Sequence, residues 1–199
     1  MATIKSNEAL TIMREGGKIL SDTFKMLSEN IKVGTNALQL DKLAYEFIKD
    51  HKAEPSFLGY SGYEYTTCIS KNEEIVHGIP YKNKEMYPGD ICSIDIGVHF
   101  KGYHVDAARI FIMEPLDPKV QHLVDITEQS FFEGIKDIKA GNKMGDLSNA
   151  IQTHIESNGL TVVTDLYSHG IGKDLHEDPL IPNYGKKDQG IELKQGMTF

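Results

Sequence analysis

Hydrophobic residues recur at three- and four-residue steps in four stretches of the chain, which is the spacing of amphipathic helices. The first stretch follows Ser6, a residue that can cap a helix, and the second follows Thr35. The third starts at Asp117-Pro118, a capping residue before a proline, and the fourth ends at Asn158-Gly159. The faces expected to be buried are Leu10, Met13, Gly17, Leu20, Phe24 and Leu27 in the first stretch; Leu40, Leu43, Ala44, Phe47 and Ile48 in the second; Val120, Leu123, Val124, Phe131 and Ile135 in the third; and Leu147, Ala150, Ile151 and Ile155 in the fourth.

A two-residue alternation predicts a strand over residues 91–98. After a turn at Lys101-Gly102, residues 103–113 are its expected hairpin partner. Further strands are expected over 160–168 and from about Ile191, and residues 60–70 are expected to run from loop into strand. Within 91–98, one face carries Ile94, Ile96 and Val98, and the other carries Ser93, Asp95 and Gly97.

The two halves of the chain resemble each other at an offset of 107 residues. Each half has two helical patterns followed by strands, which suggests a duplicated unit related by a pseudo-twofold axis. The duplication places a counterpart of the Asp95 carboxylate about three positions beyond Phe199, so the second copy is expected to be cut in mid-strand. The matched positions are Ile31-Lys32-x-Gly34 with Ile138-Lys139-x-Gly141, Leu40 with Leu147, Ile48 with Ile155, and Gly89 with Gly196.

Composition narrows the class of protein. The 199 residues carry a net charge of −8, which argues against a protein that mainly grips phosphate backbones. The sequence has neither a long apolar run for a membrane span nor a hydrophobic signal region at its start. Two cysteines do not make a disulfide framework, so a soluble protein of the reducing cytosol is expected.

Two carboxylates could meet on the predicted hairpin. Asp95 sits between apolar neighbours on the central strand, and Asp106 follows eleven residues later on its partner. A buried carboxylate must be hydrogen-bonded, paired or bound to a metal, and a cation between two of them would relieve their repulsion. Two interpretations stay open: a metal site, or one carboxylate that caps a turn.

Three histidines add imidazole to this set. His169 is followed by Gly170 and Gly172, which allow close backbone approach, and His176 lies seven residues after His169. His77 ends an apolar stretch before a turn. Each could instead be a structural hydrogen-bonding residue. Motifs for a serine nucleophile, a P-loop, paired Cys-x-x-Cys and His-Glu-x-x-His are absent, and Cys68 and Cys92 fit buried structural thiols. Carboxylates with imidazole suit Mn, Fe, Co or Zn.

These residues form a recognisable set. In order along the chain they are His77-Gly78-Ile79-Pro80, Asp95 with Asp106, Ser168-His169-Gly170-Ile171-Gly172, and His176-Glu177-Asp178-Pro179. Together they closely resemble type I methionine aminopeptidases, and the likeness covers essentially the whole chain. Residues 193–199 are similar to that family's final approach to a metal-ligand strand.

The resemblance implies an α+β fold of the pita-bread type, with a curved antiparallel sheet covered by helices and an internal pseudo-twofold repeat. It implies one catalytic domain over residues 1–199, C-terminally incomplete, with half-repeats at about 7–113 and 114–199. It also implies two divalent metal ions (Co, Mn, Fe or Zn). Asp95 would be a bidentate ligand, Asp106 would bridge both ions and His169 would bind one of them.

The family's activity is hydrolysis that removes the initiator methionine from nascent polypeptides, with a metal-activated water as the nucleophile. His176 is implied to hydrogen-bond the scissile carbonyl, and His77 to contact the scissile amide or the residue after methionine. A monomer that acts on peptides beginning with Met is implied, with the ribosome as a candidate partner and no need for a membrane or nucleic acid. The implied methionine pocket is lined by Phe57, Tyr60, Cys68 and Leu175.

Two glutamate ligands of the family have no counterpart within these 199 residues, and one of them is the general base. The alternative is therefore a non-catalytic pita-bread binding protein or an inactive fragment. A third interpretation, a proline-specific peptidase or creatinase, usually requires an extra N-terminal domain, whereas only six residues precede the first predicted helix.

Overall fold

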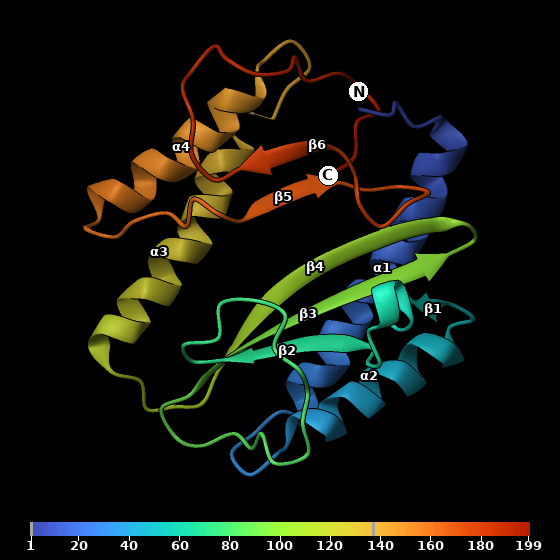
Figure 1. Cartoon of the computed structure of the whole chain (residues 1–199), viewed down its shortest axis with the longest axis vertical. Coiled ribbons are helices and arrows are strands. Elements are labelled where there is room, and N and C mark those ends of the chain that lie inside the picture. Colours follow the sequence, from blue (N-terminus) through green and yellow to red (C-terminus); the bar gives the residue numbers. More distant parts are fainter. Residues whose placement is uncertain (1, 137) are drawn as a thin grey trace. The chain divides into compact units, whose positions relative to one another are not determined.

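The computed structural model describes residues 2–136 and 138–199. The chain divides into two compact units (Figure 1). We call Glu8–Asp117 with Lys173–Leu175 the sheet unit, and Met1–Asn7, Pro118–Gly172 and His176–Phe199 the hairpin unit. None of the helices described is long and apolar enough to cross a membrane.

The sheet unit is built around two long antiparallel strands that are consecutive in the chain. Strand β3 (Ile91–Phe100) pairs along one edge with β4 (Tyr103–Ile112), and along its other edge with β2 (Thr67–Lys71) and the short β1 (Glu54–Pro55). The predictions of a strand over 91–98, a hairpin partner over 103–113 and a loop running into a strand over 60–70 are confirmed.

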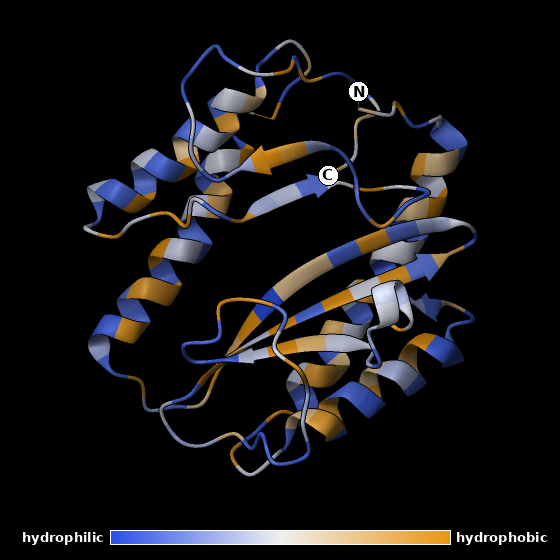
Figure 2. Ribbon diagram, in the orientation of Figure 1, coloured by the Kyte–Doolittle hydropathy of each residue, from blue (hydrophilic) through white to orange (hydrophobic). Residues whose placement is uncertain are grey.

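Helices α1 (Asn7–Asn30) and α2 (Ala37–Asp50) cover one face of this sheet (Figure 1). Ile94, Ile96 and Val98 of β3 are fully buried there against the apolar sides of both helices. Each such side chain stabilises the fold by about 1.5–3 kcal/mol. The alternation along β3 and β4 is visible as successive bands in Figure 2, and it turns Asp95 to the opposite face.

Both helices largely follow the predicted pattern. In α1 the buried positions include Gly16 and Ile19, whereas the expected Leu10 and Gly17 are only half-buried. The α2 helix begins after Asn36, whose side chain accepts from the Gln39 N–H at 3.0 Å, while the Gln39 side chain accepts from the Asn36 N–H at 3.3 Å. This capping box satisfies two backbone donors at the helix start.

The hairpin unit contains helices α3 (Pro118–Ile135) and α4 (Met144–Ser157) and a two-stranded antiparallel sheet. Strand β5 (Tyr167–Gly170) pairs with β6 (Glu177–Pro182). A small apolar cluster fills this unit, with Met144 and Leu147 of α4 packed against Ile181 of β6 and Leu193.

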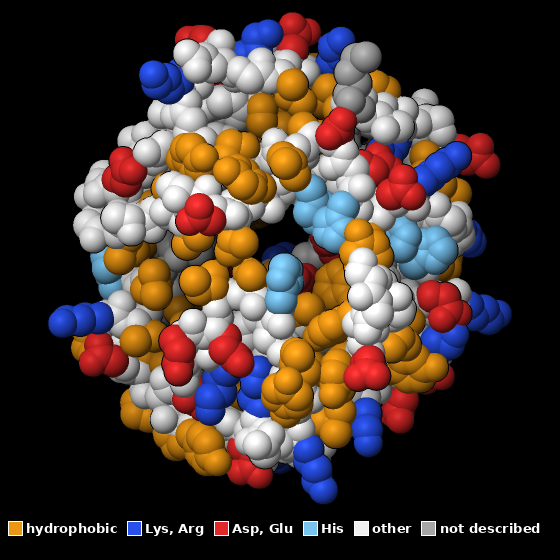
Figure 3. Space-filling model, viewed as in Figure 1, with side chains coloured by type: hydrophobic (Ala, Val, Ile, Leu, Met, Phe, Trp, Pro, Cys, Tyr) orange, Lys and Arg blue, Asp and Glu red, His pale blue; other side chains and the backbone are white. Residues whose placement is uncertain are grey.

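The predicted buried face of α3 is confirmed only in part. Val124 is buried and Val120 is half-buried. Leu123, Phe131 and Ile135, however, are 44%, 55% and 37% exposed, and orange side chains gather over α3 in Figure 3. The reason is the close approach of α4: a β-carbon at Gly134 would lie 2.7 Å from the Ile151 side chain. The small residues therefore face α4, and the larger apolar ones turn outward.

Two predicted strands are also shorter than expected. The strand predicted over 160–168 begins only at Tyr167. Its only partner among the described strands is β6, and the pairing of the two strands starts with Tyr167 opposite Pro182. Near Ile191 the chain forms a single β-bridge between Lys143 and Glu192. An apolar sequence without a neighbouring strand to pair with does not become a strand.

The repeat at an offset of 107 residues is present as a backbone motif in each unit. In the sheet unit the Gly34 N–H donates to the Met86 carbonyl at 2.8 Å, and in the hairpin unit the Gly141 N–H donates to the Leu193 carbonyl at 2.9 Å. A β-bridge joins Asn36 to Glu85 just as Lys143 is joined to Glu192. The bounds of α2 and α4 differ by the same 107 positions, so the two loops and helices were correctly matched from sequence.

Candidate functional site

Asp95 and Asp106 lie on the same face of the sheet unit. Asp95 pairs with Ala108 across β3 and β4, and Gly97 pairs with Asp106. The two carboxylate residues are therefore diagonal neighbours, a relation in which α-carbons are typically about 7–8 Å apart. The helices of this unit pack on the other face of the sheet, so neither carboxylate is buried beneath them.

The electrostatics of this pair are unfavourable without a cation. Burial, and next the negative charge of Asp106, raise the pKa of Asp95 to about 7, although the Ile96 N–H lowers it by hydrogen bonding. A metal-free site at pH 7 therefore holds Asp95 partly protonated. A divalent cation would replace that proton and remove the repulsion.

Cys68 and Phe57 adjoin the carboxylates on this face. Cys68 of β2 pairs directly with Asp95. Burial, and next the charges of Asp95 and Asp41, raise the pKa of the Cys68 thiol, although Tyr63 lowers it by hydrogen bonding, so the thiol is neutral at pH 7. The Phe57 ring lies against Gly97, where a β-carbon would be 2.7 Å from Phe57 Cε1.

The remaining predicted pocket residues belong to the same unit. Tyr60 begins a short 3-10 helix, Tyr60–Gly62, and is 47% exposed. Its N–H donates to the Phe57 carbonyl at 3.0 Å, which ties the two aromatic residues together. Leu175 is 3% exposed and groups with this unit. The sheet unit thus holds all four residues expected to line the pocket.

His77 is held at the outer edge of β2. It has a left-handed backbone, with φ 57, and is exposed. Next to it, Gly78 lies flush against the strand: its carbonyl accepts from the Ile69 N–H at 2.7 Å and its N–H donates to Ser70 Oγ at 3.0 Å. A β-carbon at Gly78 would be 2.3 Å from the Ile69 carbonyl oxygen, so only glycine permits this contact.

His169 and His176 come together in the hairpin unit. Their ring centroids are 4.3 Å apart in an edge-to-face arrangement. His169 lies near the end of β5, and His176 directly precedes β6. Gly170 allows the two strands to approach, because a β-carbon there would be 2.2 Å from the Asp178 carbonyl oxygen. The sequence prediction that the glycines serve close backbone approach is confirmed.

Carboxylates and imidazoles are ligands that Mn, Fe, Co and Zn accept, and each unit supplies one of these two kinds. The sheet unit supplies two carboxylates whose repulsion a cation would relieve, and the hairpin unit supplies two imidazoles. Within residues 2–136 and 138–199, no group of three or more His, Cys, Asp and Glu side chains could by itself hold a metal. The candidate ligands Asp95 and Asp106 thus stand together in one unit, and His169 stands in the other.

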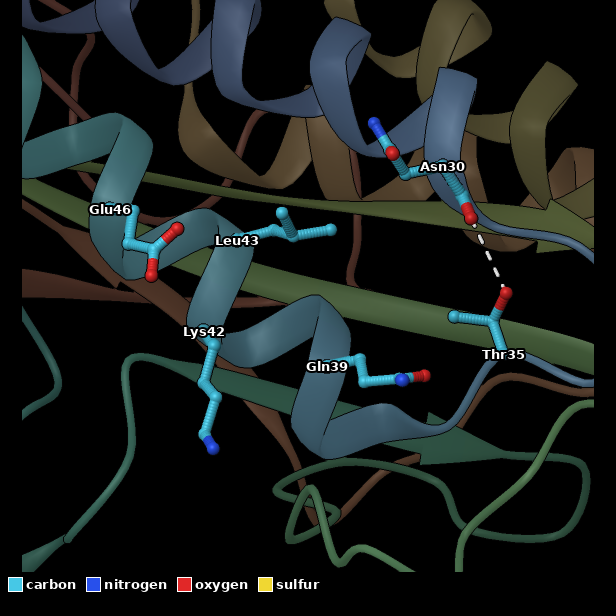
Figure 4. A pocket seen from close by; sticks show the side chains of 6 residues that line it. All are labelled: Asn30, Thr35, Gln39, Lys42, Leu43 and Glu46. Atoms are coloured by element: carbon cyan, nitrogen blue, oxygen red, sulfur yellow. Dashed lines mark hydrogen bonds between the residues drawn. The ribbon is translucent and has the colours of Figure 1, made fainter.

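A separate pocket lies on the helical side of the sheet unit (Figure 4). Thr35 donates to the Asn30 carbonyl at 3.3 Å at one end of it. Because α1 and α2 pack on the face of β3 opposite Asp95, this pocket is distinct from the candidate site. Its lining residues are Asn30, Thr35, Gln39, Lys42, Leu43 and Glu46.

One close contact near the site could be predicted from the sequence, and another could not. An isolated glycine inside a strand, such as Gly97, signals close approach by another group, here the Phe57 ring. By contrast, Lys5 pairs with Glu177 across 172 positions, and the chain near either residue carries no local pattern that signals the contact.

Comparisons with known proteins agree with this geometry. Residues 11–199 match the model of metallopeptidase family M24. The methionine aminopeptidase of Clostridium acetobutylicum is 43% identical over all of this chain and 80% of its own length, and methionine aminopeptidase 1 of Bacillus subtilis is 42% identical with the same coverage.

Solved structures give the same result. The methionine aminopeptidase of Thermotoga maritima superposes with a TM-score of 0.97 at 40% identity, over 99% of this chain and 79% of that one. The Xaa-Pro dipeptidase of Bacillus anthracis, at 22% identity and a TM-score of 0.84, covers 98% of this chain and 52% of that one, and shows the shared pita-bread fold alone. The chain therefore belongs to metallopeptidase family M24 and, within it, to the methionine aminopeptidases.

Proposed function

We propose that this chain removes the N-terminal methionine of polypeptides with two divalent metal ions held by Asp95, Asp106 and His169. The observation that carries the proposal is the diagonal pair of carboxylates on the face of the sheet opposite the helices, with Cys68 and Phe57 beside it. Bound divalent ions would supply a water of lowered pKa and polarise the scissile carbonyl.

The histidines have separate tasks in this proposal. His176 donates a hydrogen bond to the scissile carbonyl oxygen and stabilises the negative charge that develops on it. Its edge-to-face contact with His169, at 4.3 Å between ring centroids, supports a common location for the ligand and the donor. His77, fixed by Gly78 at the edge of β2, contacts the scissile amide or the residue after methionine.

The methionine side chain binds among Phe57, Tyr60, Cys68 and Leu175. A neutral thiol and two aromatic rings suit a thioether, because sulfur is polarisable and contacts ring edges favourably. The Phe57 ring fills the space above Gly97, so it limits the depth of this pocket. Residues 1–199 are proposed to act as one catalytic domain of two half-repeats, about 7–113 and 114–199, as a cytoplasmic monomer on nascent chains.

Turnover of a Met-Ala-Ser peptide tests the proposal. The chain is supplied with Mn²⁺ or Co²⁺, release of free methionine is measured, and His169→Ala serves as the control for a contaminating host enzyme. Methionine release that His169→Ala abolishes supports the proposal. A folded, metal-loaded chain that releases none overturns it and favours the non-catalytic binding protein. Release that survives His169→Ala at the wild-type rate comes from a contaminating host enzyme and counts as no release by this chain.

A further inference from the structure

Lys5 and Glu177 form a buried ion pair in the hairpin unit. Lys5 Nζ lies 2.6 Å from Glu177 Oε2, and the two side chains are only 4% and 9% exposed. Removing two charges from water costs several kcal/mol per ion, which their attraction offsets only with good geometry. Apolar residues of similar volume are often equally stable in such positions, so stability alone does not account for this pair.

The surrounding backbone is shaped to hold the pair. A β-carbon at Gly172 would lie 2.3 Å from Lys5 Cε and 2.6 Å from Glu177 Oε1, so the absence of a side chain at Gly172 makes the room. The Lys5 N–H also donates to the Gly196 carbonyl at 2.7 Å. Lys5 is thereby fixed at both its backbone and its ammonium group.

Glu177 is a backbone neighbour of both histidine segments of the candidate site. Glu177 directly follows His176 and pairs with Gly170, which directly follows His169. Glu177 is thus next to one histidine in sequence and opposite the neighbour of the other. A carboxylate locked at this position restricts the backbone on both sides of the 4.3 Å contact between the rings.

We propose that Lys5 and Glu177 are positioning residues that hold His169 and His176 in their mutual orientation. This inference rests on the proposed function for its catalytic consequence. The ion pair does not touch the substrate. It fixes the backbone at the end of β5 and the start of β6, which keeps the spacing between the His169 and His176 rings constant.

The test compares the wild-type chain with Glu177→Gln, which keeps the shape, and with the double variant Lys5→Met with Glu177→Gln. Lys18→Met with Asp22→Asn is the matched control, since it removes an exposed ion pair of the same 2.6 Å length on α1. The first readout is the nuclear Overhauser effect between the His169 and His176 rings in the metal-free chain. It should be strong in wild type and control and at least threefold weaker in the two Glu177 variants.

The second readout is kinetic. With Mn²⁺ and a Met-Ala-Ser peptide, kcat should fall at least tenfold in the folded Glu177 variants, while KM stays within threefold. A double variant with wild-type ring contact overturns the inference, as does one with wild-type kcat. If the wild-type chain has no activity, the proposed function fails, whereas the ring contact still decides the role of the ion pair. If the double variant does not fold, Glu177→Gln alone decides both readouts.

Discussion

Asp106 stands opposite Gly97, two residue pairs along the sheet from Asp95. The pairing of β3 with β4 is therefore sufficient to bring two carboxylates to one face without any loop. A site built on paired strands has little freedom to relax when its charges repel. Burial is the largest cause of the raised pKa of Asp95, and the repulsion from Asp106 is the next.

This raised pKa makes the stability of the metal-free chain depend on pH. The pKa of Asp95 is about 7 in the folded chain against an ordinary value of 3.8, so the folded state retains a proton that the unfolded state releases. The contribution of the Asp95 proton to stability should be fully present below pH 4 and be lost as pH rises to about 7, by an amount on the order of a few kcal/mol. Urea unfolding at pH 5 and pH 8 in the presence of EDTA measures this difference.

Asp95→Asn is the control for that measurement. It removes the titrating group, so most of the difference between pH 5 and pH 8 should disappear and the metal-free variant should be the more stable protein at pH 8. Saturating Mn²⁺ should stabilise the wild-type chain at pH 8 and not the variant. Equal urea midpoints for wild type and Asp95→Asn at both values would contradict the assignment.

The face of β3 could be predicted from sequence because one strand's alternation is a local property. Ile94 and Ile96 had to face a core, which placed Asp95 on the other side. The α3 helix shows the limit of this reasoning. Leu123 and Phe131 share an apolar stripe, yet Ser130 and Gly134 face inward, because α4 packs so closely that only small residues fit between the helices. The spacing of apolar residues in a sequence does not reveal how closely a neighbouring helix packs.

The repeat was predictable for a different reason. Gly34 and Gly141 both have positive φ, a conformation that strongly favours glycine, so the positions stay recognisable after the surrounding residues have diverged. The pairing of Lys5 with Glu177 had no such signature. A lysine near the start and a glutamate 172 positions later look like ordinary surface residues until the fold buries them together.

Gly97→Ala should disturb the pocket more than the fold. The added β-carbon would lie 2.6 Å from Ser56 Cβ and 2.7 Å from Phe57 Cε1, so the Phe57 ring must move. We expect KM for a Met-Ala-Ser peptide to rise at least fivefold and stability to fall by about 1–3 kcal/mol, as for other overpacked sites. Steady-state kinetics and urea unfolding measure the two effects.

Gly17→Ala is the matched control, because a β-carbon at this position in α1 meets nothing within 4 Å. Alanine replaces glycine in a helix here, so stability should rise by about 0.5–1 kcal/mol with kinetics unchanged. A Gly97→Ala protein with wild-type KM would show that Phe57 does not bound the methionine pocket.

Asp41→Ala should destabilise the sheet unit strongly. The buried Asp41 Oδ1 accepts from the Thr66 N–H at 3.0 Å, from the Thr67 N–H at 2.8 Å and from Thr67 Oγ1 at 2.8 Å. Its loss leaves buried donors unsatisfied at the start of β2, at a cost of about 2–4 kcal/mol. Urea unfolding tests this, with Asp22→Ala on the exposed side of α1 as a control that should change stability little. Similar midpoints for both variants would refute the role of Asp41.

The repeated helix starts should respond differently to pH because one cap is an amide and the other a carboxylate. Asn36→Ala removes the cap of α2 and should cost about 1 kcal/mol at any pH.

At α4, Asp146 accepts from the backbone N–H groups of Asp188 and Lys143, and these hydrogen bonds lower the pKa of Asp146 below 3.8. Its contribution is present above that value and is lost as pH falls through the lowered pKa. Asp146→Ala should therefore destabilise the chain at pH 7, and its deficit should shrink as pH falls below 3.8, provided both proteins still fold there. Urea unfolding across this range, with Asn36→Ala as the reference that keeps its deficit, decides the point. A deficit of Asp146→Ala that stays constant to the lowest pH would mean that packing, and not its ionised carboxylate, holds the start of α4.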